Sequence, residues 1–338
     1  MAEIEDLLSP HRVAQLLNER LSTPEFRWSN IVVDNIQPIK ENIIHDYYSI
    51  VVAYSVSYVN NGLKHRAVVY CSAHSNGSRR QAMENLEFIW RQNIPEGQFL
   101  TNKPLFYEPQ YEAMFYLGWP GDNFCQYFTR HSREEISSQL TLIAQWLARL
   151  HTLTLGFSEW PDSRIQKIGQ IVPGRERSLE RIQRNTPQYY ERFARIYDYL
   201  EAWESRLWPT PDKLAIIHGD IHPENVIITE KGVAIIDWSD LCLGDPLRDI
   251  GSFSQQLIFM GLGQINDESY WHQAQDKFLS AYGQAMGNNL PENWLERCRL
   301  YYYFTAFRTA IYFVTKSGPE PERAEGLLEE IEINLLYL

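Results

Sequence analysis

The spacing of apolar residues changes along the chain and divides it into helical and β-rich parts. Between residues 4 and 20 the apolar positions recur at helical spacing, which predicts an opening helix or helix pair. From Asn30 the pattern becomes β-rich in the runs IVVDNIQPI, YYSIVVAYSVSYV and HRAVVYCSA. The last two runs flank Asn60-Asn61-Gly62, and an Asn-Gly pair in this position is typical of a tight hairpin. Three antiparallel strands are therefore predicted.

A helix and a further strand follow these three strands. Residues 79–92, RRQAMENLEFIWRQ, have the pattern of a helix, and YEAMFYLGWPG predicts a strand that runs into a Pro-Gly turn. The first part of the chain is thus predicted to be a small antiparallel sheet with one helix. We expect it to end near residues 117–121.

Past Gly121 the helical spacing returns, most clearly in SQLTLIAQWLARLHTL. Only residues 225–237 interrupt it, where the apolar runs VIIT and VAII flank Glu230-Lys231-Gly232 and predict a second short hairpin. Residues 270–338 are again helical. The prediction is an α+β protein with an N-terminal helical extension (1–28), a smaller lobe (29–117) and a larger, mainly helical lobe (118–338).

Length and charge narrow the classes of function. The chain has 338 residues, more than one compact domain usually holds. Its net charge is −12, which argues against a surface that neutralises the phosphates of a nucleic acid polymer. The acidity suits a cationic small-molecule substrate, and it equally suits a protein that is acidic for solubility.

Cysteine spacing and the N-terminus favour a cytoplasmic protein. The four cysteines, at positions 71, 125, 242 and 298, form neither a CxxC pair nor a dense disulfide framework. The N-terminus MAEIEDLLSPHRV carries acids where a signal peptide has basic residues. No apolar run approaches the length that spans a membrane, so no membrane association is expected.

The segment IIHGDIHPENVIITEKGVAIIDW carries the candidate chemistry. Asp220 and Asn225 stand five residues apart, and Asp237 ends an apolar run twelve residues later. Phosphoryl transfer needs a carboxylate that accepts the proton of the attacking hydroxyl, together with oxygen ligands for a metal that bridges the nucleotide phosphates. The protein-kinase catalytic loop places its base and its first metal ligand at the same separation. The spacing predicts Mg²⁺-dependent phosphoryl transfer.

HGDIHPEN followed by IIDW and GDPLRDI resembles the signature of the aminoglycoside phosphotransferase and choline kinase family. ARLHTL at residues 148–153 and MFYLGWPG at residues 114–121 resemble the helix before the catalytic loop and the connection between the lobes. The resemblance implies a two-lobed, protein-kinase-like fold. It also implies a small-molecule kinase that moves the γ-phosphate of ATP or GTP to a hydroxyl of an aminoglycoside-like or amino-alcohol-like acceptor.

Carried over by position, the resemblance implies the roles of several residues. Asp220 is the catalytic base, Asn225 and Asp237 hold Mg²⁺, and the segment Met114, Phe115, Tyr116 and Leu117 lies alongside the adenine. Residues 29–117 would then be the nucleotide-binding sheet, and residues 118–338 would supply the catalytic loop and the acceptor site.

Three further residues near the motif are predicted to be structural. His218 is expected to orient the backbone of the loop. Asp245 before Pro246 has the pattern of a helix N-cap, and Asp249 would lie in the first turn of that helix. The resemblance adds that an Asp of this motif braces the catalytic loop.

Two features expected of a working kinase are not evident. The third strand places Tyr70 where a phosphate-binding Lys is expected, and the first hairpin, PIKENIIHDYYS, has no glycine. Arg66, Arg79 and Arg80 are the candidate replacements, and Gln81 or Glu84 stands near the position of the partner Glu. The alternative to an active kinase is a pseudokinase that binds a nucleotide or ligand with impaired transfer.

The run Tyr301–Phe304 and the glutamates of the last helical segment suggest an aromatic, anionic pocket for an amine. Their helical spacing also fits ordinary core positions and a solvated face, and we favour this interpretation. No acceptor-binding residue is assigned from the sequence.

Overall fold

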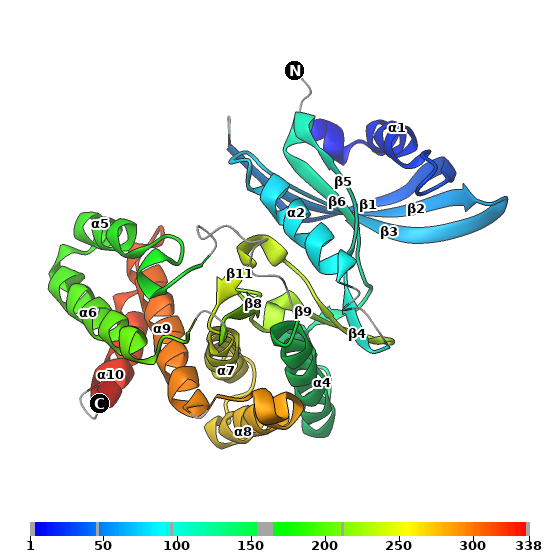
Figure 1. Ribbon diagram of the computed structural model, residues 1–338. Helices are drawn as coiled ribbons and strands as arrows, with labels where there is room; N and C mark the ends of the chain where they lie inside the picture. Colours follow the sequence, from blue (N-terminus) through cyan, green and yellow to red (C-terminus); the bar gives the residue numbers. More distant parts are fainter. Residues whose placement is uncertain are drawn as a thin grey trace. The chain divides into compact units, whose positions relative to one another are not determined.

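The computed structural model describes residues 4–44, 47–92, 94, 97–153, 165–210, 213–291 and 293–335. The chain forms two compact units. The first unit contains Met1–Asp122 and Asn225–Asp240, and the second contains Asn123–Glu224 and Leu241–Leu338. An antiparallel sheet dominates the first unit and helices dominate the second, so the predicted α+β class is confirmed (Figure 1).

The first unit is built on a five-stranded antiparallel sheet in the order β1-β2-β3-β6-β5. The strands are β1 (Trp28–Ile44), β2 (Tyr47–Asn60), β3 (Leu63–His74), β5 (Lys103–Glu108) and β6 (Ala113–Leu117). A 3₁₀ helix (Ile4–Leu8) and α1 (Pro10–Leu21) precede it, and α2 (Ser78–Arg91) follows β3. The opening helix pair, the three strands and the helix were all predicted.

The alternation of side chains along β3 gives the sheet two different faces. Val69 and Cys71 are fully buried in one core with Leu17 of α1, whereas Tyr70 points to the other face. In Figure 1, α1 and α2 lie on opposite sides of the sheet. Residues of β3 whose side chains point the same way as Tyr70 therefore lie on the face that does not carry α1.

The predicted turn between β2 and β3 has the geometry that Asn-Gly favours. Asn61 and Gly62 have φ of 50° and 78°, so both central residues of the turn are left-handed. This local signal fixes the register, in which Asn60 pairs with Leu63 and Ala53 with Tyr70.

A small second sheet joins distant parts of the chain in the order β4-β10-β9-β7. The predicted hairpin forms β9 (Val226–Thr229) and β10 (Gly232–Ile235), and β4 (Phe99–Thr101) adds to β10 in parallel. β7 (Asp122–Asn123) is the point at which the chain passes into the second unit. The sequence did not predict β4 or β5.

The second unit is mainly helical, as predicted. Its helices are α3 (Phe124–Tyr127), α4 (Arg133–His151), α5 (Arg175–Asn185), α6 (Tyr190–Leu207), α7 (Leu247–Leu262), α8 (Glu268–Met286), α9 (Trp294–Thr315) and α10 (Pro321–Leu335). α7 packs on α9, and α4 packs on α8. β8 (Ala215–Ile217) and β11 (Cys242–Gly244) form an antiparallel pair that the sequence did not predict. None of the helices in the described ranges is long and apolar enough to cross a membrane.

Candidate active site

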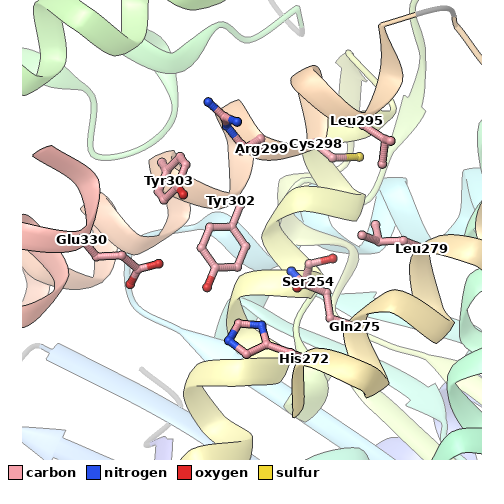
Figure 2. A pocket seen from close by; sticks show the side chains of 10 residues that line it. All are labelled: Ser254, His272, Gln275, Leu279, Leu295, Cys298, Arg299, Tyr302, Tyr303 and Glu330. Atoms are coloured by element: carbon pink, nitrogen blue, oxygen red, sulfur yellow. The ribbon is translucent and has the colours of Figure 1, made fainter. Parts of the chain in front are cut away.

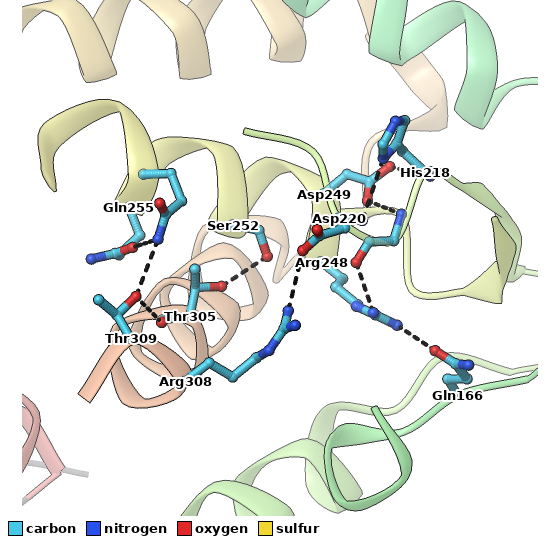
Figure 3. A network of polar contacts seen from close by, with 12 residues as sticks. Gln166, His218, Asp220, Arg248, Asp249, Ser252, Gln255, Thr305, Arg308 and Thr309 are labelled. Carbon is cyan, nitrogen blue, oxygen red and sulfur yellow. Dashed lines mark hydrogen bonds and ion pairs between the residues drawn. The ribbon is translucent and has the colours of Figure 1, made fainter. Parts of the chain in front are cut away.

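The loop after β8 carries Asp220, and the start of α7 holds this loop in place. The backbone N–H groups of His218 and Gly219 donate to the two carboxylate oxygens of Asp249, at 2.7 and 2.9 Å. Arg248 donates from Nη2 to the carbonyl oxygen of Gly219, at 2.8 Å (Figure 3). Gly219 has φ of 86°, a conformation that favours glycine. Both the N–H groups and a carbonyl oxygen of the backbone just before Asp220 are thus held by side chains of α7. This confirms the prediction that an Asp of the GDPLRDI segment braces the loop.

His218 has the structural role predicted for it. Its side chain is fully buried, and its Nδ1 accepts from the backbone N–H of Asp220 at 3.3 Å. His151 at the end of α4 completes the support, because its Nε2 lies 3.1 Å from the Asp249 carboxylate and its Nδ1 lies 2.9 Å from the Tyr282 hydroxyl. No role was predicted for His151, since nothing local distinguishes it from a core residue of its helix.

Asp245 caps α7 from one position earlier than predicted. The helix begins at Leu247, so Pro246 occupies the cap position, and Asp245 Oδ1 accepts from the Leu247 N–H at 3.0 Å. Asp245 also forms a buried two-point ion pair with Arg297 of α9, at 2.7 and 2.5 Å. This partner explains why the carboxylate is buried, and it could not be inferred from the capping pattern.

The buried clamp at Asp249 should make stability depend on pH. Burial alone raises the pKa of Asp249, but hydrogen bonds from His151 and the loop N–H groups, together with nearby histidines, lower it below its ordinary value. A lowered pKa in the folded protein means that this group adds stability above its unfolded pKa, and that the stability is lost as pH falls through the folded pKa. Asp249→Asn should therefore cost about 3 to 5 kcal/mol at neutral pH and reduce the loss of stability in acid.

Urea denaturation of the parent and of Asp249→Asn between about pH 7 and pH 3 tests this clamp. Asp276→Asn, an exposed acid on α8, is the matched control and should behave like the parent. Equal stability of Asp249→Asn and Asp276→Asn at neutral pH would show that Asp249 does not hold the loop.

Asp220 opens into a pocket of the second unit. This pocket has a volume of about 790 Å³ and is lined by Asp220, Ile221 and His222 of the loop, with residues of α5, α6, α7 and α9. The Asp220 side chain is partly exposed, and Arg308 of α9 reaches toward it, with 3.5 Å between Nη1 and Oδ1 (Figure 3). A carboxylate beside a solvent-filled pocket can receive a proton from a bound hydroxyl.

The two predicted metal ligands lie together at one end of the β9–β10 hairpin in the first unit. The Asn225 carbonyl oxygen accepts from the N–H of Ile236 at 3.0 Å, so Asn225 lies beside the residue that precedes Asp237. Asp237 is exposed and has φ of 61°, a strained conformation for a residue other than glycine. Ser239 stabilises it by donating from Oγ to Asp237 Oδ1 at 2.6 Å. Asp220 belongs to the second unit, and the chain passes from it into the first unit between Glu224 and Asn225.

Asn85 of α2 holds the segment that follows Asp237. Its side chain is almost fully buried, and Nδ2 donates to the Trp238 carbonyl oxygen at 2.8 Å. Gln81 donates in turn to Asn85 Oδ1 at 3.1 Å, whereas Glu84 pairs with the exposed Arg80. The sequence had named Gln81 and Glu84 and missed Asn85, because a buried Asn in a helix has no local signature.

The predicted adenine segment lies on β6, and its four side chains have different surroundings. Phe115 is fully buried in the core with α1, and Met114 is buried on the other face. Tyr116 stacks on Tyr70, with 5.6 Å between the ring centroids. Leu117 lines a pocket of the first unit of about 1060 Å³, which also includes Val56, Val68, Gly118 and Trp119. Leu117 thus packs partly against the core with α1 and also lines this pocket.

Tyr70, the residue expected at the position of the missing Lys, packs its ring against the chain after β6. A Cβ on Gly118 would lie 2.3 Å from the Tyr70 ring, so the ring packs directly on the Gly118 backbone. The pKa of the neighbouring Tyr116 hydroxyl is raised, chiefly by burial and further by the negative charge of Asp237, whereas Arg79 acts in the opposite direction. Asp237 and Arg79 therefore both lie close to Tyr116.

The three candidate cations have different environments. Arg66 lines the pocket that contains Leu117, and Arg80 is 75% exposed, with its Nε 3.6 Å from Glu84. Arg79, at the start of α2, has a buried Nε with no hydrogen-bond partner among the described residues. Of the three arginines, Arg79 is thus the one with a buried guanidinium nitrogen that lacks a hydrogen bond within the described residues.

A smaller pocket of about 360 Å³ lies elsewhere in the second unit (Figure 2). Tyr302 and Tyr303 of α9, Glu330 of α10 and His272 of α8 line it. Of the predicted core positions, Tyr303, Phe307, Ala310 and Ile311 are buried, whereas Tyr312 is exposed. Asp220 does not line this pocket.

Solved structures share this fold over nearly the whole chain. A choline kinase from Cryptosporidium parvum Iowa II matches with a TM-score of 0.65 at 13% identity, over 97% of this chain and 95% of that chain. The aminoglycoside phosphotransferase APH(2″)-IIa, in a complex with streptomycin and ATP, matches with a TM-score of 0.57 at 14% identity, over 95% of each chain. The spectinomycin phosphotransferase APH(9)-Ia, with ADP and spectinomycin, gives 0.55 at 16% identity, over 96% and 99%.

The fold is therefore the kinase-like α+β fold of the aminoglycoside phosphotransferases and choline kinases. No curated protein matches the chain. Residues 116–296, more than half of its length, match the model of the phosphotransferase enzyme family. The chain belongs to this family, and the prediction of a small-molecule phosphotransferase is confirmed at that level.

Proposed function

We propose that this protein transfers the γ-phosphate of ATP or GTP to a hydroxyl of a small molecule, with Asp220 as the base. The observation that carries the proposal is the fixed loop: Asp249 and Arg248 hold the backbone before Asp220, while the Asp220 carboxylate stays open to a pocket. A base held in one position accepts a proton without reorganisation during the reaction. The acceptor would bind in the pocket of the second unit.

Asn225 and Asp237 would hold Mg²⁺ with the nucleotide. Their amide and carboxylate oxygens are the hard ligands that Mg²⁺ prefers, and Mg²⁺ usually takes only one or two ligands from the protein when phosphates supply others. The exposed Asp237, in its left-handed conformation beside Asn225, suits this use. Bound there, Mg²⁺ would neutralise charge on the phosphates during transfer.

The nucleotide base would lie against the first unit. Val56, Val68 and Leu117 give its pocket an apolar wall, and Leu117 ends the segment that the family resemblance aligns with adenine. A flat aromatic base is well matched by such a wall. Nucleotide binding is thus assigned to the first unit, together with the metal ligands, and acceptor binding to the second.

Arg79 would replace the strand Lys as the cation that contacts the phosphates. Its Nε is buried and unsatisfied among the described residues, and its charge acts on the same tyrosine as Asp237 does. A buried guanidinium nitrogen without a partner is costly, and a phosphate oxygen would satisfy it. Arg66 and Arg80 lack this combination.

Replacement of Arg79 by Ala should weaken the binding of ATP with Mg²⁺ by about tenfold to a hundredfold, the range for one charge-assisted hydrogen bond. Calorimetry measures this directly. The matched control is Arg80→Ala, one position along the same helix, where the exposed side chain should contribute little. An unchanged affinity in Arg79→Ala, with a loss in Arg66→Ala, would assign the contact to Arg66 instead.

The second candidate is a pseudokinase that binds a ligand with impaired transfer. It is favoured by Tyr70, the residue expected at the position of the Lys, whose ring packs against Gly118. Thermal-shift measurements with ATP and with GTP, each with and without Mg²⁺, address nucleotide binding. We expect a nucleotide to raise the melting temperature in a Mg²⁺-dependent manner. Absence of any shift at millimolar nucleotide would count against a kinase.

A further inference from the structure

The pocket beside Asp220 is richer in basic than in acidic side chains. Its described lining residues include four cations and two acids, namely Arg181, Arg308, Lys316 and Arg323 against Asp220 and Glu224. This local excess is opposite to the net charge of the whole chain, which is −12. The local charge of the pocket, and not the net charge of the whole protein, decides the charge of the substrate that binds there.

Two of these cations share one carboxylate, which offsets one of their two positive charges. Glu320 pairs with Lys316 and, at 3.0 Å, with Arg323. Arg181 of α5 has no ion pair with another described residue, and Arg308 has only the 3.5 Å approach to Asp220, which is long for a hydrogen bond. Arg181 and Arg308 are therefore the cations that the pocket offers to a ligand.

Arg308 lies where it can act on a ligand that also reaches Asp220. Tyr197 and Arg308 both line this pocket, and burial raises the pKa of the Tyr197 hydroxyl, which the positive charge of Arg308 lowers. Figure 3 shows Arg308 extended from α9 toward Asp220, and it also shows the hydrogen-bonded hydroxyls of Ser252 and Thr305. Both hydroxyls line the pocket, and because one of them donates to the other at 2.8 Å, one O–H remains that can donate to an anion.

We propose that the acceptor carries an anionic group, a carboxylate or a phosphate, which Arg308 and Arg181 bind while the acceptor hydroxyl faces Asp220. This inference rests on the proposed transfer to a hydroxyl and specifies its substrate class. Guanidinium groups bind carboxylates and phosphates through paired hydrogen bonds. A cationic acceptor would instead place its charge beside Arg308, with like-charge repulsion. The acceptor class is thus opposite to the amine that the acidic composition suits.

The charge of the acceptor can be measured before its identity is known. A small-molecule extract, freed of nucleotides with charcoal, is separated by ion exchange into anionic, neutral and cationic fractions. Each fraction is incubated with the protein, Mg²⁺ and ATP labelled in the γ-phosphate. We expect labelled product from the anionic fraction. Treatment of that fraction with a phosphatase, removed afterwards, separates the two sources, because a phosphate-bearing acceptor is lost and a carboxylate-bearing one survives.

Variants of the arginines connect the result to this pocket. Arg308→Ala should raise the amount of anionic fraction needed for half-maximal rate by about tenfold to a hundredfold, and Arg308→Lys should restore part of it. Arg181→Ala, at an exposed position where folding is not at risk, should raise it by about threefold to tenfold. The matched control is Arg299→Ala, an exposed arginine of α9 at the other pocket, which should behave like the parent.

The outcomes separate this inference from the proposed function. Labelled product from the cationic or neutral fraction alone would overturn the anionic acceptor and leave phosphotransfer intact. Label in no fraction would overturn the proposed function and this inference with it. A lower kcat in Arg308→Ala with an unchanged half-maximal concentration would make Arg308 a positioning residue for Asp220, which would also overturn its role in binding the anion.

Discussion

Asp220→Asn should lower the turnover number by about two orders of magnitude or more while nucleotide affinity stays close to that of the parent. An amide cannot accept the proton of the attacking hydroxyl, but it has the same shape as the carboxylate. The groups that fix the loop, Asp249 and Arg248, contact the backbone of His218 and Gly219 and are untouched by the change. The variant should therefore fold normally and fail in the chemical step.

Single-turnover transfer of labelled phosphate to the acceptor fraction measures this effect, because it isolates chemistry from product release. Glu230→Gln is the matched control: it makes the same chemical change at an exposed position of the β9–β10 turn and should leave the rate unchanged. A rate in Asp220→Asn within a few-fold of the parent would remove Asp220 from the role of base.

Asp237→Ala should abolish Mg²⁺-dependent nucleotide binding. The change removes the only full negative charge among the two proposed ligands, whereas Asn225→Ala removes a neutral amide and should weaken binding less. Alanine is also strained at the φ of 61° found there. Asp237→Asn is therefore the cleaner variant, since Asn tolerates this conformation, and it should also lose the metal dependence.

Calorimetry with ATP, in the presence and absence of Mg²⁺, distinguishes loss of the metal site from loss of folding. The variants should retain whatever weak affinity the parent has without Mg²⁺, and the gain on adding Mg²⁺ should disappear. Glu230→Ala on the same hairpin should keep that gain. An undiminished effect of Mg²⁺ in Asp237→Asn would show that the metal is held by other residues.

Features with short-range signals were predictable from the sequence. The two hairpins were found because Asn61-Gly62 and Lys231-Gly232 lie between apolar runs, and the turn residues sit in the chain where the strands reverse. The spacing of Asp220, Asn225 and Asp237 was visible for the same reason, since all three lie within one short segment. Strands and site residues that are close in sequence leave a pattern that can be recognised within one short segment.

Features made by distant residues left no such pattern. β4 pairs with β10 through Phe99 and Val233, and β8 pairs with β11 through Ala215 and Gly244, each in strands of three or four residues that are too short to show a period. The side chains that support the loop before Asp220 also come from distant parts of the sequence. His151 reaches Asp249 across 98 positions of the chain, a relation that spacing in a single sequence does not reveal.

The charge of the pocket beside Asp220 is the clearest case of a feature that the sequence did not predict. The acidic composition suited both a cationic substrate and a protein that is acidic for solubility, and the acids are spread along the whole sequence. Arg308 comes within 3.5 Å of Asp220 only because α9 packs beside α7, which carries the clamp on the loop. Local charge in a site depends on such packing, so it has to be taken from the structure.

The most direct test of the central claim is whether the protein transfers phosphate to a small molecule through Asp220. The unfractionated small-molecule extract is incubated with ATP labelled in the γ-phosphate, Mg²⁺ and either the parent or Asp220→Asn, and labelled products are counted after the nucleotide is removed. We expect a labelled small molecule with the parent and about a hundredfold less with the variant. A parent that binds ATP with Mg²⁺ but labels nothing, or a variant that labels as fast as the parent, would contradict phosphotransfer through Asp220.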